Sequence, residues 1–451
     1  MWRLTLLEIL TAADSSLAQS NVAGALAAAG LGSGDRVVLL VPGSASYVSV
    51  VLGATRSGVV PVPLDPRLTP YERDAILRDV EPGLVIDTPE ALDELLVGAP
   101  RDIAQSPRCR PMHFTSGTTG RPKGVWSGLL DDEDAAQLVR EERDLWGFCE
   151  SDLDLVVSPI YHSAPLRFAM GTLLAGGSIA VLPGFDPPVF VAAVHELHPT
   201  TMFCVPAHLQ RLFAWLDGDG NGDGDGAGVA RSVDAASFRL VAHAGAPCPE
   251  PVRRRAHDLF GTDVVWEFYG STEGQFTACS ATEWQRHPGT LGRARPGRVV
   301  STDDDGQLWC AVPPWAGFTY WNAPEKTAAS WRATPDGPAF SVGDLGRVDD
   351  GWVYLDSRRE DLIISGGVNV YPAEVEAALA DTVGLVDLAV FARDDARWGQ
   401  RVCAAYVGDV DEAALRARAE SRLAPPKRPK TYERLPSLPR TATGKVRRSE
   451  L

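Results

Sequence analysis

Several features that would define other protein classes are missing from this sequence of 451 residues. No run of apolar residues reaches the length of about 18 that suggests a membrane-spanning helix. Lysine is scarce, and the net charge of −16 leaves no basic stripe to bind nucleic-acid phosphates. We therefore expect no membrane span and no nucleic-acid partner. Arginine makes up most of the basic residues, which suggests a GC-rich genome, so we assign no function to the arginines as a class.

The seven cysteines lack the spacing of a metal site or a disulfide framework. They are scattered along the chain, and no two of them form a C-x-x-C pair. This distribution is typical of reduced thiols in a cytosolic protein. The first residues also contain no long uninterrupted apolar stretch and no clear cleavage site for a signal peptide. We expect a cytoplasmic protein.

The length of the chain and its hydrophobic pattern indicate an α/β protein with more than one domain. At 451 residues the sequence exceeds a single ordinary hydrophobic core. Strand-like runs at 35–41 and 59–64 enclose a helical stretch at 47–56 that Gly58 closes. The same order of strand, helix and strand recurs further along, which predicts parallel-rich sheets covered by helices.

A change of pattern near Asp350 marks a second domain. A compact strand pair follows it, and then a helix with Pro372 in its first turn. We predict a large N-terminal domain over residues 1–357 and a small, mobile α+β domain over residues 358–451.

The loop 115–124, with the sequence TSGTTGRPKG, is the most informative segment of the chain. Its glycines allow backbone N–H groups to point toward one place, its hydroxyl groups add donors, and Lys123 adds a positive charge. It differs from the common nucleotide P-loop, because Pro122 stands where that loop needs a glycine before the lysine. We predict a polyphosphate-binding loop. Its candidate contacts are Thr115, Ser116, Gly117, Thr118, Thr119 and Lys123.

This loop and three later segments resemble the motifs of the adenylate-forming superfamily, which includes acyl-CoA synthetases, peptide-synthetase adenylation domains and luciferases. Residues 269–273 (YGSTE) resemble the second ATP motif of that family. Residues 343–345 (GDL) and 356–358 (DSR) resemble its ribose motif and hinge. Residues 439–445 (PRTATGK) resemble the loop that carries its catalytic lysine. The motifs follow the family's order across nearly the whole chain.

The resemblance implies a role for each motif in activating a carboxylate with ATP. Glu273 would bind Mg²⁺, for which a hard carboxylate oxygen is suited, and Thr272 would contact a phosphate oxygen. Asp344 would accept both ribose hydroxyls. Lys445 would stabilise charge on the carboxylate and the α-phosphate. Tyr269 offers a flat face for adenine, with a place in the core as the alternative. The other implied ATP contacts are Gly245, Ala246, Pro247, Gly270, Ser271 and Arg358.

The resemblance also implies a second step, in which a thiol attacks the acyl-adenylate. Gly366 and Gly367 resemble a pair of glycines that lets pantetheine pass close to the backbone. Trp398 lies in a segment that resembles one near the nucleotide of CoA. Lys427 and its basic neighbours either meet the CoA phosphates or form a solvated turn. Glu360 occupies the hinge position, where the family usually has Asp or Lys.

The acyl site is expected beside His162, which resembles the aromatic gate between the ATP and acyl sites. Amino-acid-activating relatives have an aspartate near this position, and none is seen here. We therefore expect an acid that has no α-amino group and an uncharged tail. The acyl-pocket candidates are His162, Phe168, Val205 and His243. In the alternative, Arg167 and His243 recognise a second polar group on the substrate. The candidate catalytic residues are His162, Thr272, Glu273 and Lys445.

Together these expectations describe an AMP-forming acid–CoA ligase, most similar to bacterial fatty-acid–CoA ligases and related acyl-CoA synthetases. A carboxylic acid and ATP, with Mg²⁺, would give acyl-AMP and pyrophosphate, and CoA would then give the acyl-CoA. Three alternatives stay open. The acyl group could pass to the phosphopantetheine of an acyl carrier protein, the substrate could be an unusual oxyanion, or the chain could bind ATP without turnover.

Overall fold

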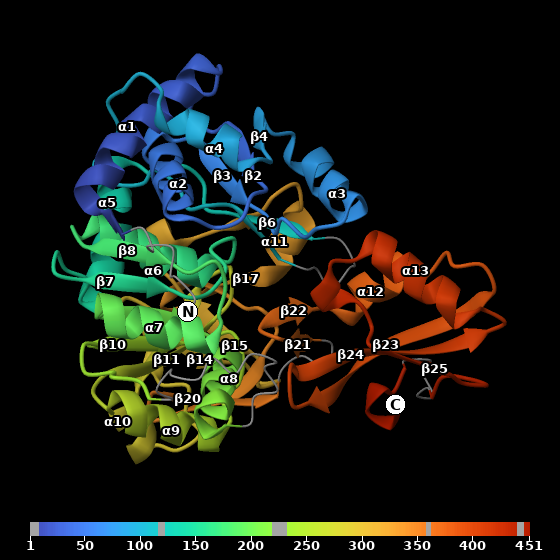
Figure 1. Ribbon diagram of the computed structural model, residues 1–451. Helices are drawn as coiled ribbons and strands as arrows, with labels where there is room; N and C mark the ends of the chain where they lie inside the picture. The colour runs from blue at the N-terminus through green and yellow to red at the C-terminus, as the bar shows by residue number, and fades with distance from the viewer. Residues whose placement is uncertain (1–8, 116–121, 219–231, 358–361, 440–445) are drawn as a thin grey trace. The chain divides into compact units, whose positions relative to one another are not determined.

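The computed structural model describes residues 9–115, 122–218, 232–357, 362–439 and 446–451 and has the predicted α/β class (Figure 1). The chain forms two compact units. The large unit contains residues up to Pro66, Pro82–His113 and Val125–Asp356. The small unit contains Arg67–Glu81, Phe114–Gly124 and Ser357–Leu451. The expected domain boundary at 357–358 stays a prediction, because the hinge residues 358–361 lie outside the described residues.

A ten-stranded sheet forms the centre of the large unit. Its strands, in order across the sheet, are β1 (Ile9–Thr11), β8 (Ser178–Val181), β7 (Leu153–Val156), β9 (Thr201–Cys204), β10 (Leu240–His243), β11 (Val265–Gly270), β12 (Gln275–Ser280), β13 (Arg293–Ala294), β20 (Trp352–Ser357) and β19 (Leu345–Asp349). From β8 to β11 the pairing is parallel, and it is antiparallel from β11 to β20. The parallel strands are almost continuously apolar and buried, as expected for a sheet covered on both faces.

Helices follow the parallel strands of this sheet in turn (Figure 1). They are α6 (Ser163–Leu174), α7 (Pro187–Leu197), α8 (Pro206–Asp217) and α9 (Glu250–Phe260). Two further helices of the unit are α5 (Asp132–Trp146) and α10 (Ala281–Arg286). No helix in the described part of the chain combines the length and the apolar character of a membrane-crossing segment.

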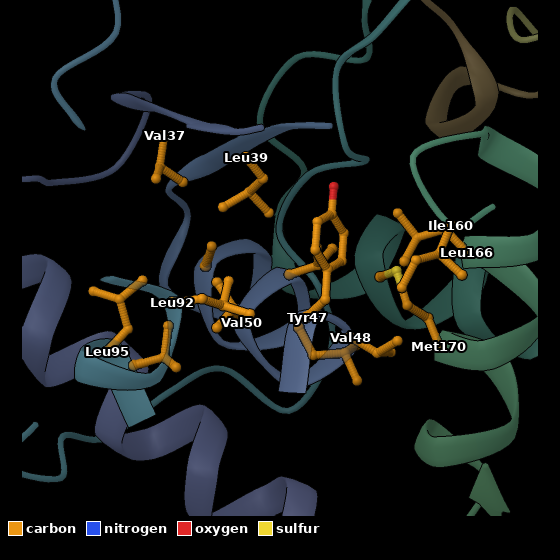
Figure 2. Packing of buried hydrophobic residues seen from close by; sticks show 14 of the residues in the cluster. Val37, Leu39, Tyr47, Val48, Val50, Leu92, Leu95, Ile160, Leu166 and Met170 are labelled. Atoms are coloured by element: carbon orange, nitrogen blue, oxygen red, sulfur yellow. The ribbon is translucent and has the colours of Figure 1, made fainter. Parts of the chain in front are cut away.

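The N-terminal part of the large unit is a parallel sheet with helices packed against it. The sheet contains β3 (Val60–Pro63), β2 (Arg36–Leu39) and β4 (Leu84–Ile86), and its helices are α1 (Ala12–Ala28), α2 (Ala45–Ser57) and α4 (Pro89–Leu96). Ser44 caps the start of α2 by accepting from the Tyr47 N–H, and Gly58 ends it at a φ of 81°. This confirms the predicted strand–helix–strand segment. Figure 2 shows its core, where Tyr47 lies between Leu39 on one side and Leu166 and Met170 of α6 on the other.

Two smaller sheets and a helix are further elements of the described chain. The first sheet contains β14 (Val299–Thr302), β15 (Leu308–Ala311), β18 (Gly337–Phe340) and β17 (Trp331–Thr334). The second contains β16 (Thr319–Tyr320), β6 (Lys123–Trp126) and β5 (His113–Thr115). The helix is α11 (Pro324–Ser330), preceded by the 3₁₀ turn η1 (Pro314–Ala316).

The small unit is an α+β sandwich of one sheet and three helices. Its strands are β22 (Val368–Val370), β21 (Ile363–Ser365), β24 (Gly399–Gly408), β23 (Leu385–Asp395) and β25 (Thr431–Arg434). Its helices are α3 (Pro70–Val80), α12 (Pro372–Leu379) and α13 (Glu412–Arg422), with short 3₁₀ turns η2 (Pro425–Lys427) and η3 (Arg448–Glu450). Helix α3 comes from a distant part of the sequence and packs against α13.

A buried group of three charges holds α3 in the small unit. Lys427 Nζ donates to Glu72 Oε1 at 3.0 Å and to Glu374 Oε1 at 2.6 Å. The side chains of all three are at most 13% exposed. Burial alone would lower the pKa of Lys427, but the two carboxylates more than offset this and raise it. Lys427 is therefore neither the CoA contact nor the solvated turn that the sequence suggested.

Replacing Lys427 with Met should destabilise the protein by about 3–5 kcal/mol, the usual cost of removing one partner of a buried ion pair. The variant leaves Glu72 and Glu374 buried without their cation. Urea unfolding measures the loss. The loss should shrink below pH 4, because a carboxyl group whose pKa is raised in the folded state costs stability only above its unfolded pKa of about 4.3.

Lys430→Met is the matched control for this variant. Lys430 Nζ donates to the backbone oxygen of Pro425 at an exposed position, so its replacement should cost less than about 1 kcal/mol. Equal losses in the two variants, or a Lys427→Met loss that does not depend on pH, would contradict the assigned role of the buried charges.

Candidate active site

The second ATP motif forms the tight turn between β11 and β12. The Ser271 N–H donates to the Gly274 carbonyl oxygen at 2.9 Å. A Cβ atom on Gly270 would lie 2.7 Å from that same oxygen, so the turn needs glycine there. Ser271 Oγ is buried and lacks a hydrogen-bond partner among the described atoms. The turn therefore holds a hydroxyl group that a ligand oxygen would satisfy.

A buried hydrogen bond joins the second ATP motif to the ribose motif. Tyr269 Oη donates to Asp344 Oδ2 at 2.6 Å, and the two residues are 4% and 9% exposed. The Tyr269 ring packs against Phe276 with ring centroids 4.9 Å apart. Tyr269 thus belongs to the core, which was the alternative to an adenine contact, and its hydroxyl orients the carboxylate predicted to bind ribose.

Glu273 is a buried carboxylate next to Thr272 in the same turn. It is 6% exposed, and its Oε1 accepts from Tyr320 Oη at 2.7 Å. Among the described residues no three His, Cys, Asp or Glu side chains form a metal site. A single carboxylate of this kind fits Mg²⁺, which proteins usually hold through one or two carboxylates together with substrate phosphates.

Several of the predicted residues follow adjacent parallel strands and share one edge of the central sheet. Val205 comes after β9 and Gly245 after β10, and a Cβ atom on Gly245 would contact Val205 at 3.6 Å. Thr272 comes after β11, and His162 is the N-cap residue of α6, which follows β7. Ligands of open α/β sheets bind at this carboxyl edge. Ala246 and Pro247 lie in the same loop as Gly245.

Two acyl-pocket candidates are instead buried inside the large unit. Phe168 is fully buried among aromatic rings, including those of Trp146 and Phe203. His243 is 1% exposed, with Nδ1 at 4.0 Å from Glu267 Oε1. Burial, with the positive charge of Arg253, lowers the pKa of His243 to about 3, so it is neutral near pH 7.

A cavity of about 300 Å³ lies in the large unit beside the second ATP motif. Ser271, Thr272, Gly274 and Gln275 form one part of its wall. Apolar side chains of α5 and α6 form another part, from residues Leu138, Val139, Leu166, Met170 and Leu174. Ser163, the neighbour of His162, also lines it. The cavity is therefore a candidate acyl site, but Phe168, Val205 and His243 do not line it.

Except for Arg167, the charged side chains in and next to the wall of this cavity were missed in the sequence. Glu142 accepts from Arg295 Nη1 at 2.8 Å and lies 3.6 Å from Arg167 Nε. Glu141 accepts from Arg298 Nη1 at 2.8 Å. Burial raises the pKa of Glu142, but Arg167 and Arg295 more than offset this and bring it to about 2. No local motif marks these residues, since each pair joins segments distant in the sequence.

The candidate CoA residues meet in the small unit. Gly366 and Gly367 form the turn between β21 and β22 with φ of 60° and 82°, values that favour glycine. The Gly366 N–H donates to the Trp398 carbonyl oxygen at 2.8 Å. A Cβ atom on Gly366 would lie 2.9 Å from the Trp398 ring. The structure thus places the glycine backbone directly against the indole ring.

The remaining candidates lie in or next to segments outside the described residues. Thr115 ends β5 and Lys123 begins β6, and Thr115 Oγ1 donates to the Lys123 carbonyl oxygen at 3.4 Å. The candidates outside the described residues are Ser116, Gly117, Thr118, Thr119, Arg358, Glu360 and Lys445.

Comparison with known proteins gives matches over nearly the whole chain. The AMP-binding enzyme family matches residues 8–109 and 100–312, and the AMP-binding enzyme C-terminal domain matches residues 374–445. A feruloyl-CoA synthase from Amycolatopsis sp is 32% identical over 98% of this chain and 93% of its own length. The fatty acid–[acyl-carrier-protein] ligase ScoC from Streptomyces coeruleorubidus is 30% identical over 96% and 89%.

A solved structure is similar over the same extent. It is a double mutant of the o-succinylbenzoate CoA synthetase of Bacillus subtilis, bound with its product analogue OSB-NCoA. Its TM-score is 0.82 and its sequence identity 26%, over 97% of this chain and 92% of that chain.

Tyr269→Phe should lower kcat/KM for ATP by about 10- to 100-fold, the usual worth of a hydrogen bond to a charged group. The variant keeps the packed ring and removes the bond that orients Asp344. Initial rates of pyrophosphate release at varied ATP measure the effect. Tyr354→Phe is the control, because the Tyr354 ring lies 4.4 Å from the Arg347 guanidinium and Phe keeps that ring. Unchanged ATP dependence in Tyr269→Phe would show that the hydroxyl does not serve the nucleotide.

Proposed function

This chain belongs to the AMP-binding enzyme family, and from that premise we propose how its residues catalyse the two steps of an acid–thiol ligase. The enzyme activates a carboxylic acid with ATP to an acyl-AMP, with release of pyrophosphate, and then transfers the acyl group to the thiol of CoA. The observation that carries the assignment of residues is the cavity whose wall contains Ser271 and Thr272. An acid in that cavity lies beside the nucleotide motif.

In the first step an oxygen of the substrate carboxylate attacks the α-phosphorus, and pyrophosphate leaves. Thr272 and the Ser271 hydroxyl donate to phosphate oxygens, and Asp344, held by Tyr269, accepts from the ribose hydroxyls. Glu273 would hold Mg²⁺, which would neutralise phosphate charge when bound. Lys123 would stabilise the leaving pyrophosphate, and Lys445 the charge that develops at the α-phosphate. His162 would close the acyl site.

In the second step the CoA thiolate attacks the acyl carbon, and AMP leaves. Pantetheine would pass over the turn at Gly366 and Gly367, where the missing side chains leave the backbone accessible. Trp398 fixes the position of that turn. Glu360 is the proposed hinge between the steps. A carrier-protein phosphopantetheine is the second candidate acceptor, because the chain is also similar to a fatty acid–[acyl-carrier-protein] ligase.

Lys445→Ala should slow acyl-AMP formation by about 10²–10³-fold, the usual effect of removing one preorganised charge from a transition state. The family resemblance implies that this lysine serves the first step only. ATP–pyrophosphate exchange measures the first step, and a synthetic acyl-adenylate given with CoA measures the second. The second step should run at a near-normal rate. Its collapse in the variant would contradict the separation of roles.

Gly366→Ala should reduce thioester formation and leave ATP–pyrophosphate exchange nearly unchanged. The added Cβ atom would lie 2.9 Å from the Trp398 ring and narrow the proposed pantetheine path. Gly399→Ala is the matched control. Gly399 also has a positive φ, of 73°, but its Cβ atom would meet no other atom within 4 Å. Equal loss of thioester formation in both variants would trace the effect to backbone strain. CoA and a carrier protein are tested in parallel to identify the acceptor.

A further inference from the structure

Arginines outnumber carboxylates in the wall of the cavity beside the second ATP motif. Five arginines line the cavity, and Glu142 is the carboxylate among its lining residues. Glu142 and its neighbour Glu141, which does not line the cavity, pair with three of these arginines. We call four of these arginines and the two glutamates the charged wall: Arg110, Arg167, Arg295, Arg298, Glu141 and Glu142.

Both glutamates of the charged wall are already paired with arginines. Glu142 binds Arg295 and Arg167 and also accepts from Trp146 Nε1 at 3.2 Å. Glu141 binds Arg298 and lies 3.7 Å from Arg295 Nη2, and its Oε1 accepts from Trp315 Nε1 at 2.9 Å. The two carboxylates therefore offset two of the four positive charges.

Arg110 is the arginine that these pairs leave out. Its Nη1 and Nη2 donate to the backbone oxygens of Glu273 and Gly317 at 3.3 and 2.8 Å. No carboxylate among the described residues lies within 4.0 Å of its guanidinium nitrogens. Burial, together with the positive charges of Arg298 and Arg167, lowers the pKa of Arg110 to about 10, so it stays charged near pH 7.

The other titratable groups near the charged wall do not restore the balance. Glu273 is the next carboxylate to influence Arg110, but it accepts from Tyr320 and is the proposed Mg²⁺ ligand. His113 also lines the cavity, and burial lowers its pKa to about 3, so it is neutral. Arg143 lines the cavity too and adds a further positive charge, paired with Asp144 at 3.2 Å.

Another part of the lining is apolar. Leu138 and Val139 of α5 and Leu166, Met170 and Leu174 of α6 supply it. The occupant that fits both parts of the lining has a hydrocarbon or ring body and a second negative group besides the carboxylate that reacts. A guanidinium group binds a carboxylate through two parallel N–H···O bonds, which makes carboxylate the best-matched anion.

We propose that the cavity selects a dicarboxylic acid, one carboxylate of which is activated beside Thr272 while the other binds Arg110 in the charged wall. This inference rests on the proposed function and specifies its substrate class. A second carboxylate supplies the partner that an excess buried positive charge lacks. Two expectations for the substrate came from the sequence: an uncharged tail, or a second polar group that Arg167 helps to recognise. The dicarboxylate proposal favours the second.

The first experiment compares acids of matched size on the wild-type enzyme. Octanedioate is paired with octanoate, and 3-(2-carboxyphenyl)propanoate with 3-phenylpropanoate. Pyrophosphate release and thioester formation with CoA are measured for each. In at least one pair, kcat/KM should be about 100-fold higher for the diacid, as expected for a charged hydrogen-bonded contact.

The possible results separate this inference from the proposed function. If the monoacids are activated as well as their diacids or better, the dicarboxylate inference is wrong and the ligase assignment stands. If no acid of either kind gives pyrophosphate, the proposed function fails and the inference fails with it.

The second experiment tests Arg110 with three variants. Arg110→Met should lower kcat/KM for the diacid about 100-fold while the matched monoacid keeps its rate or gains. Arg110→Lys keeps the charge and a donor for the backbone oxygens of Glu273 and Gly317, and it should retain a preference for the diacid. Arg108→Met is the control. Arg108 pairs with Asp132 at 2.6 Å, is 40% exposed and does not line this cavity, so its replacement should change both rates by less than about threefold.

Arg110→Met also removes the donor to two backbone oxygens, so its folding is checked by thermal unfolding. Equal losses for diacid and monoacid in Arg110→Met would mean that Arg110 is structural and would overturn its role in recognition. If Arg110→Met fails to fold, the matched acids on the wild type and on Arg110→Lys decide. A retained diacid preference in Arg110→Lys would support recognition through the positive charge at this position, and loss of that preference with an intact fold, or no preference in the wild type, would overturn it.

Discussion

The paired glutamates Glu141 and Glu142 are the constraint on which the shape of the proposed acyl cavity depends. They are neighbours on α5, and between them they bind arginines from α6 and from the segment after β13. Trp146 and Trp315 donate to the same carboxylates. Buried charges are tolerated only when they are paired and hydrogen-bonded, so these contacts leave the surrounding elements few alternative positions. The cavity is thus walled by ion pairs as well as by apolar packing.

Much of the fold could be predicted, because parallel strands buried on both faces appear in the sequence as continuous apolar runs. The strand expected at 35–41 is β2 (Arg36–Leu39), and the helix expected to end at Gly58 is α2, which does so with a left-handed glycine. The family motifs located the turn after β11 in the same way. The YGSTE sequence carries its own local structure, with glycine where Cβ would collide with the backbone.

The side chains that were missed are those whose partners lie far away in the sequence. Lys427 looked like part of a basic turn, but its carboxylates are 355 and 53 residues distant. Arg298 and Glu141 are separated by 157 residues, and the arginine bias of the whole chain hid four of the five arginines that line one cavity. Phe168 was expected in the acyl pocket from its neighbourhood, but its position on α6 points it into the aromatic core. Local sequence patterns do not reveal contacts between side chains that are far apart in the sequence.

The excess positive charge of the cavity wall affects how an acid is oriented in the cavity as well as how tightly it binds. A monoacid has one carboxylate and two places to put it, beside Thr272 or against Arg110. In the proposed arrangement a monoacid that binds Arg110 has no second carboxylate left for the α-phosphate, so this binding mode is unproductive and works against catalysis for such an acid. A diacid of matching length fills both places at once. The positive charge that favours unproductive binding of a monoacid therefore orients a diacid for reaction. The distance between the two carboxylates then determines which diacid reacts.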